Sequence, residues 1–563
     1  MGSAALTTDP AAGGHDRDDA RADAVSVAGT DAPVEPPAAP SFDRDALAAD
    51  LRPLVGDDAD ALADAVAADL RDVRARPAVP TPADLDLDLG LDRRTGGVCY
   101  VDRYADDLRG LAARIPALRD LGLTHLQITP VAEPAPAGDA DADDADTDTD
   151  ALLAPGVRVR AGLGSAADLG DLVDALHDAG LTLAVDLSPA DPDAALADRI
   201  RVAVREAVAL AAVGVDVVRV DPAAVLGERP DADRPVDDRS ALLRAIAALG
   251  RRVSPTLALA VAADADPRGS AELLDGDAVR LADDPALTAL VWEALATRSA
   301  GLLSRALERR GDVPTGSART ARVRSHDALR WAFDDDDARA IGIDPDEHRR
   351  FLADFHLGRF AGSHARGVAH ADGAVAGTTA SLAGLEQDDP GAVERILLAH
   401  SIALSTGGLP LLVLGDEVGQ LNDYGYDDVP AHAEDSRWVN RPLYPFDRYD
   451  ERDDRTTSTG VIHAGIRRLI AVRRATPALG GTRVVGFDAN DPHVLGYQRP
   501  HADGTVLVLA NLGDEPATVS AETLGGFAEH AVDLVRDERL RLTKGIVLSP
   551  RTFVWLQAAH DLA

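Results

Sequence analysis

The sequence predicts an α/β fold, a (β/α)8 TIM barrel with an N-terminal helical region and a C-terminal antiparallel β-domain. Apolar strands and helical stripes alternate over about 350 residues, which is typical of parallel βα units. The length of 563 residues accommodates such a barrel together with flanking domains. The last ~80 residues change to short strands separated by polar turns, which indicates an antiparallel β-sandwich.

The composition excludes several classes of protein and partner. Hydrophobic residues make up 46% of the chain, enough to bury a large core. The 95 acidic and 57 basic residues give a formal charge of -38, which repels nucleic acid and anionic membrane surfaces. Cys99 is the only cysteine, so an intramolecular disulfide and a cysteine-built zinc site are excluded. The histidines lack paired ligand spacing, and we expect no metal and no cofactor.

The acidic, lysine-poor composition is typical of proteins from salt-loving organisms. Lys544 is the only lysine, and aspartate and arginine are abundant. In molar salt the Debye length is only ~3 Å, which screens most self-repulsion. A GC-rich genome accounts for the same bias, so both explanations stay open. The first residues contain no apolar signal region and no run of about 18 apolar residues occurs, so we expect a cytoplasmic protein without a membrane span.

The domain boundaries follow from changes in composition and periodicity. Residues 1–41 contain almost no large apolar residues and are expected to form a disordered acidic tail. Residues 42–95 have helical periodicity and are expected to form a helical region that begins after Ser41. The barrel is expected over residues 96–480 and the β-sandwich over residues 481–563.

Strand-like apolar runs mark the predicted barrel and β-domain. Parallel strands are covered on both faces, which explains their near-continuous apolar character. In the barrel region the runs include residues 98–101, 124–128, 183–186, 215–221 and 257–261. In the final region they include residues 494–497, 506–510 and 552–556.

Polar residues end several of the barrel runs, and active sites of this fold lie at the carboxyl ends of its strands. Asp186 ends one run, and Arg219 and Asp221 end another. His326 and Asp327 follow the run that we expect over residues 321–325. Arg219 and Asp221 are two residues apart, so they share a strand face, and the cation is expected to keep the carboxylate ionised. Such a carboxylate suits a nucleophile, whereas a buried ion pair inside a barrel explains the same pattern equally well.

Long blocks of the sequence resemble the amylosucrases, which belong to glycoside hydrolase family thirteen, the α-amylase family. The resemblance covers most of residues 96–480. Its blocks include GGVCYVDRYADDLRG, VRSHDALRWAFDDDD, GRFAGSHARG, GLEQDDPGAVERILLAHSIALSTGGLPLLVLGDEVGQLND and DSRWVNRP. The family fold that the resemblance implies is an N-terminal helical region, a (β/α)8 barrel and a C-terminal β-domain, in agreement with the periodicity.

The resemblance implies a retaining α-glucosyl transfer from sucrose, with sucrose or an α-glucan as the carbohydrate partner. Asp221 matches the nucleophile, and Arg219 matches its neighbouring cation. Asp327, preceded by His326, matches the carboxylate that stabilises the oxocarbenium-like transition state. In such a reaction an acid protonates the leaving oxygen while the nucleophile attacks and forms a covalent glucosyl intermediate.

Two further residues of the glucosyl pocket are carried over by the same resemblance. Asp186 matches the aspartate at the end of an earlier catalytic strand. Arg437 matches an arginine at the bottom of the pocket. The family segment that supplies an aspartate partner to this arginine is absent, so we expect Arg437 to lack its salt-bridge partner.

The sequence departs from the family at the position of the general acid. The family has a glutamate where this chain has Ala262, and losing acid catalysis typically lowers the rate ~10²–10⁴-fold. Asp264 lies on the same expected strand face, but as a replacement acid it is less favoured than a solvated loop carboxylate. Only 34 residues separate Asp186 from Asp221, too few for the long inserted domain of the family. We therefore expect a transferase or hydrolase scaffold of reduced activity, or alternatively a non-catalytic carbohydrate-binding or regulatory protein. A sequence without any selected sugar function also stays open, as does the oligomeric state.

Overall fold

The computed structural model describes residues 43–71, 73, 90–134, 152–154, 157–227, 236–262 and 271–559. The predicted acidic tail over residues 1–41 and the candidate acid Asp264 lie outside the described residues. Within the described part, no helix is both long and apolar enough to cross a membrane.

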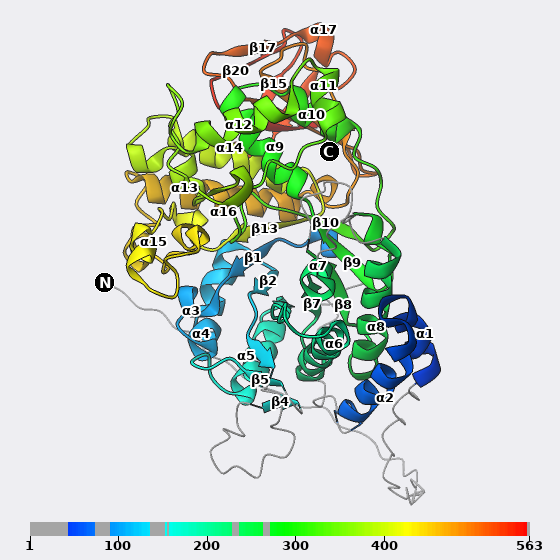
Figure 1. The fold of residues 1–563 in the computed structure, drawn as a ribbon. Coiled ribbons are helices and arrows are strands. Elements are labelled where there is room, and N and C mark those ends of the chain that lie inside the picture. The colour runs from blue at the N-terminus through cyan, green and yellow to red at the C-terminus, as the bar shows by residue number, and fades with distance from the viewer. Residues whose placement is uncertain are drawn as a thin grey trace, which may run out of the picture. The chain divides into compact units, whose positions relative to one another are not determined.

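Eight parallel strands close into the predicted barrel (Figure 1). The barrel closes because the first strand pairs with both the second and the last. Around the barrel the order is β1 (Gly96–Cys99), β2 (His125–Ile128), β6 (Thr182–Asp186), β7 (Val217–Val220), β8 (Ala258–Val261), β9 (Val279–Asp283), β10 (Ala318–Ala321) and β13 (Leu409–Val413).

Apolar side chains fill the interior of the barrel. Every second residue of a strand faces inward, and the inward set forms one buried cluster. It includes Val98, Ala184, Val217, Ala258, Ala260, Leu281, Ala318, Leu409 and Leu411. Gly96 belongs to the same crowded region, since an added Cβ would lie 2.4 Å from Leu411 Cδ2. The same alternation directs residues two positions further along toward the barrel mouth.

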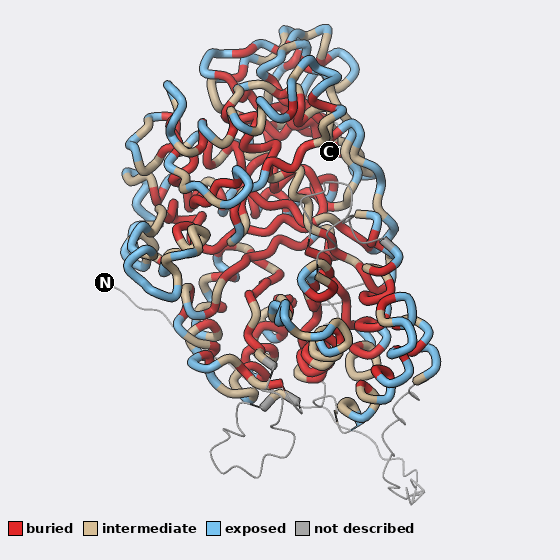
Figure 2. The backbone as a smooth tube through the Cα atoms, viewed as in Figure 1, coloured by how far each residue is buried: buried red, intermediate tan, exposed pale blue. Residues whose placement is uncertain are grey.

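Amphipathic helices surround the barrel and bury their apolar faces against it, as the buried inner layer of Figure 2 shows. Helix α5 begins with a capping box, in which Ser165 and Asp168 each bind the other's backbone N–H. Helix α9 begins at Pro285 behind the N-cap Asp284. The longer covering helices are α4 (Leu108–Leu121), α5 (Ala166–Asp178), α6 (Leu196–Val213), α8 (Val236–Val253), α9 (Pro285–Thr297), α14 (Ala392–Ser405) and α16 (Ser458–Ala475).

Shorter elements lie in the connections between the main strands and helices. The helices are α3 (Val101–Tyr104), α7 (Pro222–Leu226), α10 (Gly301–Glu308), α11 (Asp335–Ala340), α12 (Pro345–His356), α13 (Thr379–Leu382) and α15 (Phe446–Asp450). The strands are β3 (Ala132–Pro134), β4 (Leu152–Ala154), β5 (Val157–Val159), β11 (Val368–Ala369) and β12 (Val375–Ala376).

Two helices form the described part of the N-terminal region, α1 (Arg44–Val55) and α2 (Ala59–Asp69). Helix α1 begins behind Asp43, whose carboxylate accepts the N–H of Ala46 at 2.9 Å, rather than behind Ser41. The two helices pack against each other, and α1 also packs against α8 of the barrel.

The C-terminal region contains the predicted antiparallel sheet. Its six strands are, in order, β14 (Val485–Gly486), β15 (Val494–Arg499), β16 (Val506–Asn511), β21 (Phe553–Ala558), β18 (His530–Asp533) and β19 (Glu538–Arg541). A second pair consists of β17 (Ala517–Val519) and β20 (Ile546–Leu548), and α17 (Ala521–Leu524) follows β17. Arg499 joins this sheet to the barrel, because its guanidinium donates to the carbonyls of Ser405, Gly480 and Gly481.

Candidate active site

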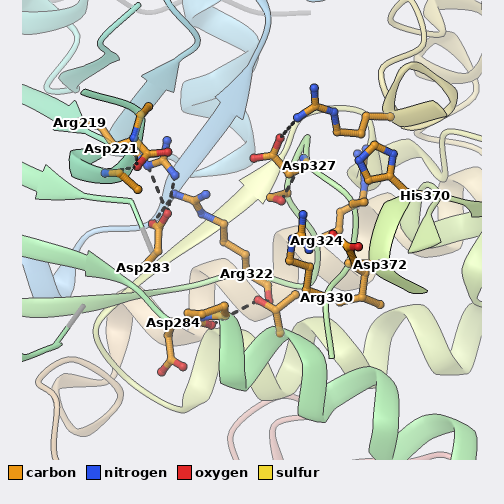
Figure 3. A pocket seen from close by; sticks show the side chains of 18 of the residues that line it. Arg219, Asp221, Asp283, Asp284, Arg322, Arg324, Asp327, Arg330, His370 and Asp372 are labelled. Carbon is orange, nitrogen blue, oxygen red and sulfur yellow. Dashed lines mark hydrogen bonds and ion pairs between the residues drawn. The ribbon is translucent and has the colours of Figure 1, made fainter. Parts of the chain in front are cut away.

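A cavity of about 1130 Å³ opens at the carboxyl ends of the barrel strands (Figure 3). Its described lining comes mainly from the ends of β7, β9 and β10 and from the segments that follow them. Asp221, Arg219, Asp327 and Arg437 of the predicted site line this cavity. Asp186 and His326 are not among its described lining residues.

Asp221 lies immediately after strand β7 and is exposed to the cavity. Its carboxylate caps helix α7 and accepts the backbone N–H groups of Ala223 at 3.0 Å and Ala224 at 3.1 Å. One oxygen, Oδ1, accepts both hydrogen bonds, which fixes the orientation of the carboxylate at the cavity wall. The sequence around Asp221 thus supplies its own positioning through the short helix that Pro222 begins.

Arg219 does not serve as the ionic partner of Asp221, so that prediction is wrong. Its Nη1 lies 3.0 Å from Asp186, and its Nη2 lies 2.6 Å from Asp283. Asp186 ends the neighbouring strand β6, and Asp283 ends β9, so both carboxylates meet the guanidinium across the barrel mouth. The ion-pair partners of Arg219 are therefore set by the strands that end near it, and not by the carboxylate two residues away on its own strand.

Five side chains form a closed hydrogen-bonded ring at the mouth of the barrel. Arg219 joins Asp186 to Asp283, and Arg322 Nη2 donates to Asp283 at 2.9 Å. Gln127 closes the circle, since its Nε2 donates to Asp186 at 2.7 Å and its Oε1 accepts from Arg322 at 3.0 Å. We call these residues the mouth ring. It contains two cations, two carboxylates and one amide, so its formal charges cancel.

The two carboxylates of the mouth ring have pKa values that are shifted in opposite directions. For Asp283, burial acts to raise the pKa, but Arg219 and Arg322 outweigh it and lower the pKa to about 2. For Asp186, burial dominates and raises the pKa despite the same two arginines. Burial also lowers the pKa of Arg322. Asp283 therefore carries the firm negative charge of the ring, which makes it unsuited to donate a proton.

Asp327 lies across the cavity with 65% of its side chain exposed. The segment from Arg322 onward lies beyond strand β10, which ends at Ala321 rather than continuing to residue 325 as predicted. Arg437 Nη1 approaches Asp327 Oδ1 at 3.3 Å, and Arg441 Nη2 approaches the same oxygen at 3.5 Å. These two arginines hold a carboxylate that is otherwise open to the cavity.

Arg437 forms salt bridges with residues other than the family aspartate, whose segment the sequence lacks. Besides Asp327, it contacts Asp435, with Nε 2.8 Å from Oδ1. The hydrogen bond to Asp435, together with its charge, raises the pKa of Arg437 above its ordinary value. One of these partners, Asp435, lies only two residues away in the sequence.

His326 lies behind the cavity wall and packs against Tyr100. The two rings meet edge to face with their centroids 4.8 Å apart. Burial, assisted by the nearby Arg324 and Arg441, lowers the pKa of His326 well below its ordinary value. A neutral imidazole in this position supports the segment that carries Asp327.

Ala262 occupies the position of the expected general acid at the end of strand β8. Its backbone N–H donates to Val220 at 2.8 Å, so residue 262 sits beside Asp221 on the adjacent strand. The carboxylates among the described lining residues are Asp221, Asp283, Asp284, Asp327 and Asp372. Asp284 caps helix α9 and forms an ion pair with Arg310 at 2.7 Å. No glutamate lines the described part of the cavity wall.

Sequence reasoning missed three members of the mouth ring, namely Gln127, Asp283 and Arg322. Asp283 ends strand β9, but Arg280 interrupts the apolar pattern of that strand, so the rule that found Asp186 gives only a weak signal here. Gln127 is one of two buried polar residues in the strand His125–Ile128, and a buried amide requires a partner. Arg322 offers no comparable signal, because its role depends on which strand ends surround it.

Comparison with known proteins supports the fold and gives a limited sequence match. No protein-family model matches the chain. The glucosylglycerate phosphorylase of Escherichia coli (strain K12) is 26% identical over 174 residues. The match covers 31% of this chain and 30% of that protein, so it spans less than a third of the curated relative.

Several solved structures share the architecture over most of their length. An α-amylase from Geobacillus thermoleovorans in complex with acarbose superimposes with a TM-score of 0.54 at 14% identity, covering 83% of this chain and 98% of that one. Sucrose 6F-phosphate phosphorylase from Thermoanaerobacter thermosaccharolyticum gives a TM-score of 0.54 at 13% identity, covering 75% and 94%. A cyclic α-maltosyl-(1→6)-maltose hydrolase from Arthrobacter globiformis gives 0.53 at 16% identity, covering 83% and 99%. The chain therefore has the fold of the α-amylases.

Proposed function

We propose that this chain is an amylosucrase-like retaining α-glucosyl transferase or hydrolase scaffold whose activity on sucrose and α-glucans is impaired. One observation carries the proposal. Asp221 and Asp327 line one cavity at the carboxyl ends of the barrel strands, while Ala262 stands beside Asp221 where an acid is required. The α-amylase fold and the sequence blocks that resemble amylosucrase support the substrate class.

In the proposed reaction Asp221 is the nucleophile. A carboxylate oxygen attacks the anomeric carbon, and the bond to the leaving sugar breaks to give a covalent glucosyl intermediate. The two N–H donors from α7 hold one oxygen of Asp221, which leaves the other oxygen to attack. Asp327 lies across the cavity and stabilises the developing positive charge of the sugar ring, with Arg437 as its positioning residue.

Arg219 and Asp186 have a different part in this account from the one that resemblance implies. Both side chains form their hydrogen bonds within the mouth ring, so we assign them to the cavity floor. Arg219 lines the cavity there, and Asp186 holds the Arg219 guanidinium in place. His326 supports the Asp327 segment from behind. Sugar binding then depends on the exposed carboxylates and on Arg437 at the opposite wall.

The alanine at position 262, in place of an acid, determines which donors can react. A sugar alkoxide is a poor leaving group that needs a proton as the bond breaks, and acid catalysis typically supplies ~10²–10⁴-fold. In a donor such as α-glucosyl fluoride, the fluoride leaves as a stable anion and needs little help from an acid. We therefore expect turnover of α-glucosyl fluoride to exceed that of sucrose by a large factor.

Turnover measurements test the proposal. Fluoride release from α-glucosyl fluoride and fructose release from sucrose are measured in molar salt, with Asp221→Asn as the inactive control. Fluoride release that disappears in Asp221→Asn, with little fructose release, supports the proposal. Rapid fructose release that depends on Asp221 contradicts the impairment, and fluoride release that is unaffected by Asp221→Asn contradicts the assigned nucleophile.

The alanine at position 262 also favours a second function, a non-catalytic carbohydrate-binding or regulatory protein that uses the same cavity. Titration calorimetry with sucrose and maltooligosaccharides separates the two functions. Binding that is weakened by Asp327→Asn, without turnover of either donor, supports the binding protein. Turnover of α-glucosyl fluoride through Asp221 supports the transferase scaffold.

A further inference from the structure

A second cavity, of about 410 Å³, is lined by helix α12, by residues 330–333 and by the turn between β11 and β12. We call it the α12 pocket. Its described lining combines four apolar residues with three arginines and one aspartate, although acidic residues outnumber basic ones by 95 to 57 in the complete sequence. Arg330 and Asp372 also line the active-site cavity, so the two cavities share part of one wall (Figure 3). Ligand pockets usually measure about 300–1,000 Å³, so the α12 pocket is large enough for a small ligand.

Hydrogen bonds hold the three walls of the α12 pocket together. Arg349 joins α12 to the neighbouring segment, because its Nε donates to the Trp331 carbonyl at 3.3 Å and its Nη2 donates to the Phe333 carbonyl at 3.2 Å. Its guanidinium also lies over the Phe333 ring, 4.5 Å from the ring centroid. The indole Nε1 of Trp331 donates to the Gly373 carbonyl at 3.2 Å, which ties the β11–β12 turn to the same segment. A pocket whose walls are already fixed loses little conformational entropy when a ligand binds.

Two of the three arginines are exposed and weakly neutralised. Arg330 has 49% of its side chain exposed, and its Nη1 lies 3.9 Å from Asp372, at the outer limit of an ion pair. Arg350 is also exposed, and its Nε donates to the Asp346 carbonyl at 3.2 Å, a hydrogen bond that does not neutralise its charge. Arg349 differs from both, since it forms an ion pair with Asp335 at 2.5 Å. Arg330 and Arg350 therefore present positive charge that solvent, and hence a ligand, can reach.

We propose that the α12 pocket binds a small aromatic anion, with its carboxylate or phosphate group on Arg330 and Arg350 and its ring against the apolar lining. Guanidinium groups recognise both kinds of anion through paired N–H donors. The apolar lining residues remove ring surface from water, and they are Trp331, Ala332, Phe333 and Ala353. This site goes beyond the proposed glucosyl transfer and does not depend on it. The ligand would contact the wall of the active-site cavity without entering that cavity.

The same arrangement predicts a competition for Arg330. Asp372 is 82% exposed and is the carboxylate that faces Arg330 within the α12 pocket. An anionic ligand on Arg330 is repelled by this carboxylate and replaces it as the partner of the guanidinium. Removing the charge of Asp372 should therefore strengthen binding, whereas removing the charge of Arg350 should weaken it.

Ligand-observed NMR titrations of the full chain test the proposal. The probes are benzoate, phenyl phosphate and the neutral benzyl alcohol. The titrations use the lowest KCl concentration at which circular dichroism shows a folded chain, because salt screens exposed charges. We expect one or both anions to bind, and their relative affinities separate a carboxylate ligand from a phosphate ligand. Arg350→Ala should raise the dissociation constant about tenfold, as for one lost charged hydrogen bond, and Asp372→Asn should lower it by up to about fivefold.

Two further variants separate the α12 pocket from its surroundings. Arg359→Ala removes an exposed arginine just beyond α12, whose ion pair with Asp354 is 3.8 Å long and which is not among the described lining residues, so binding should stay unchanged. Ala353→Phe fills the pocket without changing its charge and should abolish binding in a chain that circular dichroism shows to be folded. Equal weakening by Arg350→Ala and Arg359→Ala overturns the proposal. It is also overturned if neither anion binds, if benzyl alcohol binds as tightly as the anions, or if binding persists in folded Ala353→Phe.

Discussion

Replacing Ala262 by glutamate should restore a general acid to the cavity. Strands β7 and β8 pair in register, with Val220 opposite Val261, so residue 262 lies opposite Asp221. Neighbouring strands are ~4.7–4.9 Å apart, and retaining enzymes place their two carboxyl groups ~5–5.5 Å apart. Ala258 and Ala260 face the barrel interior, so position 262 continues toward the mouth on the same face. The backbone at position 262 is therefore suitably placed for a glutamate to act as the general acid.

The expected gain follows from the part of catalysis that is missing. Acid catalysis contributes ~10²–10⁴-fold, so fructose release from sucrose by Ala262→Glu should rise by about that factor over the unmodified protein. Ala262 is only 7% exposed, and the larger side chain is expected to lower the free energy of unfolding by ~1–3 kcal/mol. Fructose is measured enzymatically, and urea unfolding confirms that the variant is folded.

Two controls make this prediction decisive. Ala262→Gln has nearly the same shape but cannot donate a proton as a carboxylic acid does, so it should give no gain. Combining Ala262→Glu with Asp221→Asn should abolish the gain, because the acid acts only together with the nucleophile. A folded Ala262→Glu protein that releases fructose no faster than Ala262→Gln would refute the account of the missing acid.

Three further predictions concern the mouth ring, a buried glutamate and the Asp327 wall. Asp283→Asn leaves two buried guanidinium groups without their shared carboxylate and should lower the free energy of unfolding by ~3–5 kcal/mol, seen as a lower urea midpoint; an unchanged midpoint contradicts the ring. Burial raises the pKa of Glu206 to about 7 despite its hydrogen bonds from Ser188, so its folded form binds the proton more tightly than the unfolded form. Stability should then fall by up to about 3 kcal/mol between pH 4.5 and 7, and Glu206→Gln should remove this dependence in urea titrations at several pH values. Arg437→Ala removes the 3.3 Å contact to Asp327 and should lower kcat for α-glucosyl fluoride about tenfold, with a smaller change in KM. A lower kcat that is accompanied by a lower urea midpoint of unfolding would instead indicate a purely structural role.

The sequence was sufficient to predict the barrel because most of its strands are near-continuous apolar runs, although β9 (Val279–Asp283) and β10 (Ala318–Ala321) each contain an arginine. Buried parallel strands are apolar on both faces, so runs such as Leu183–Asp186 and Leu257–Val261 stand out from the amphipathic helices between them. Helix α4 (Leu108–Leu121), for example, buries apolar residues that recur at helical spacing. The boundaries of the helical region and the β-domain, at residues 95 and 480, stay predictions.

The partners of the charged residues could not be predicted in the same way. Asp221 and Asp327 follow strand ends, and their place at the cavity follows from the fold alone. Arg219, however, binds Asp283, which is 64 residues away in the sequence. That pairing depends on the tilt of neighbouring strands and on the length of each side chain, which no local pattern records.

The dependence of rate on the leaving group tests the central claim most directly. A series of aryl α-glucosides with phenols of increasing acidity is assayed for kcat/KM, with Asp221→Asn as the background. A protein that has its nucleophile but no acid should react much faster as the phenol becomes more acidic, giving a steep dependence that becomes shallow in Ala262→Glu. A shallow dependence in the unmodified protein would show that a proton donor is already present and would contradict the account.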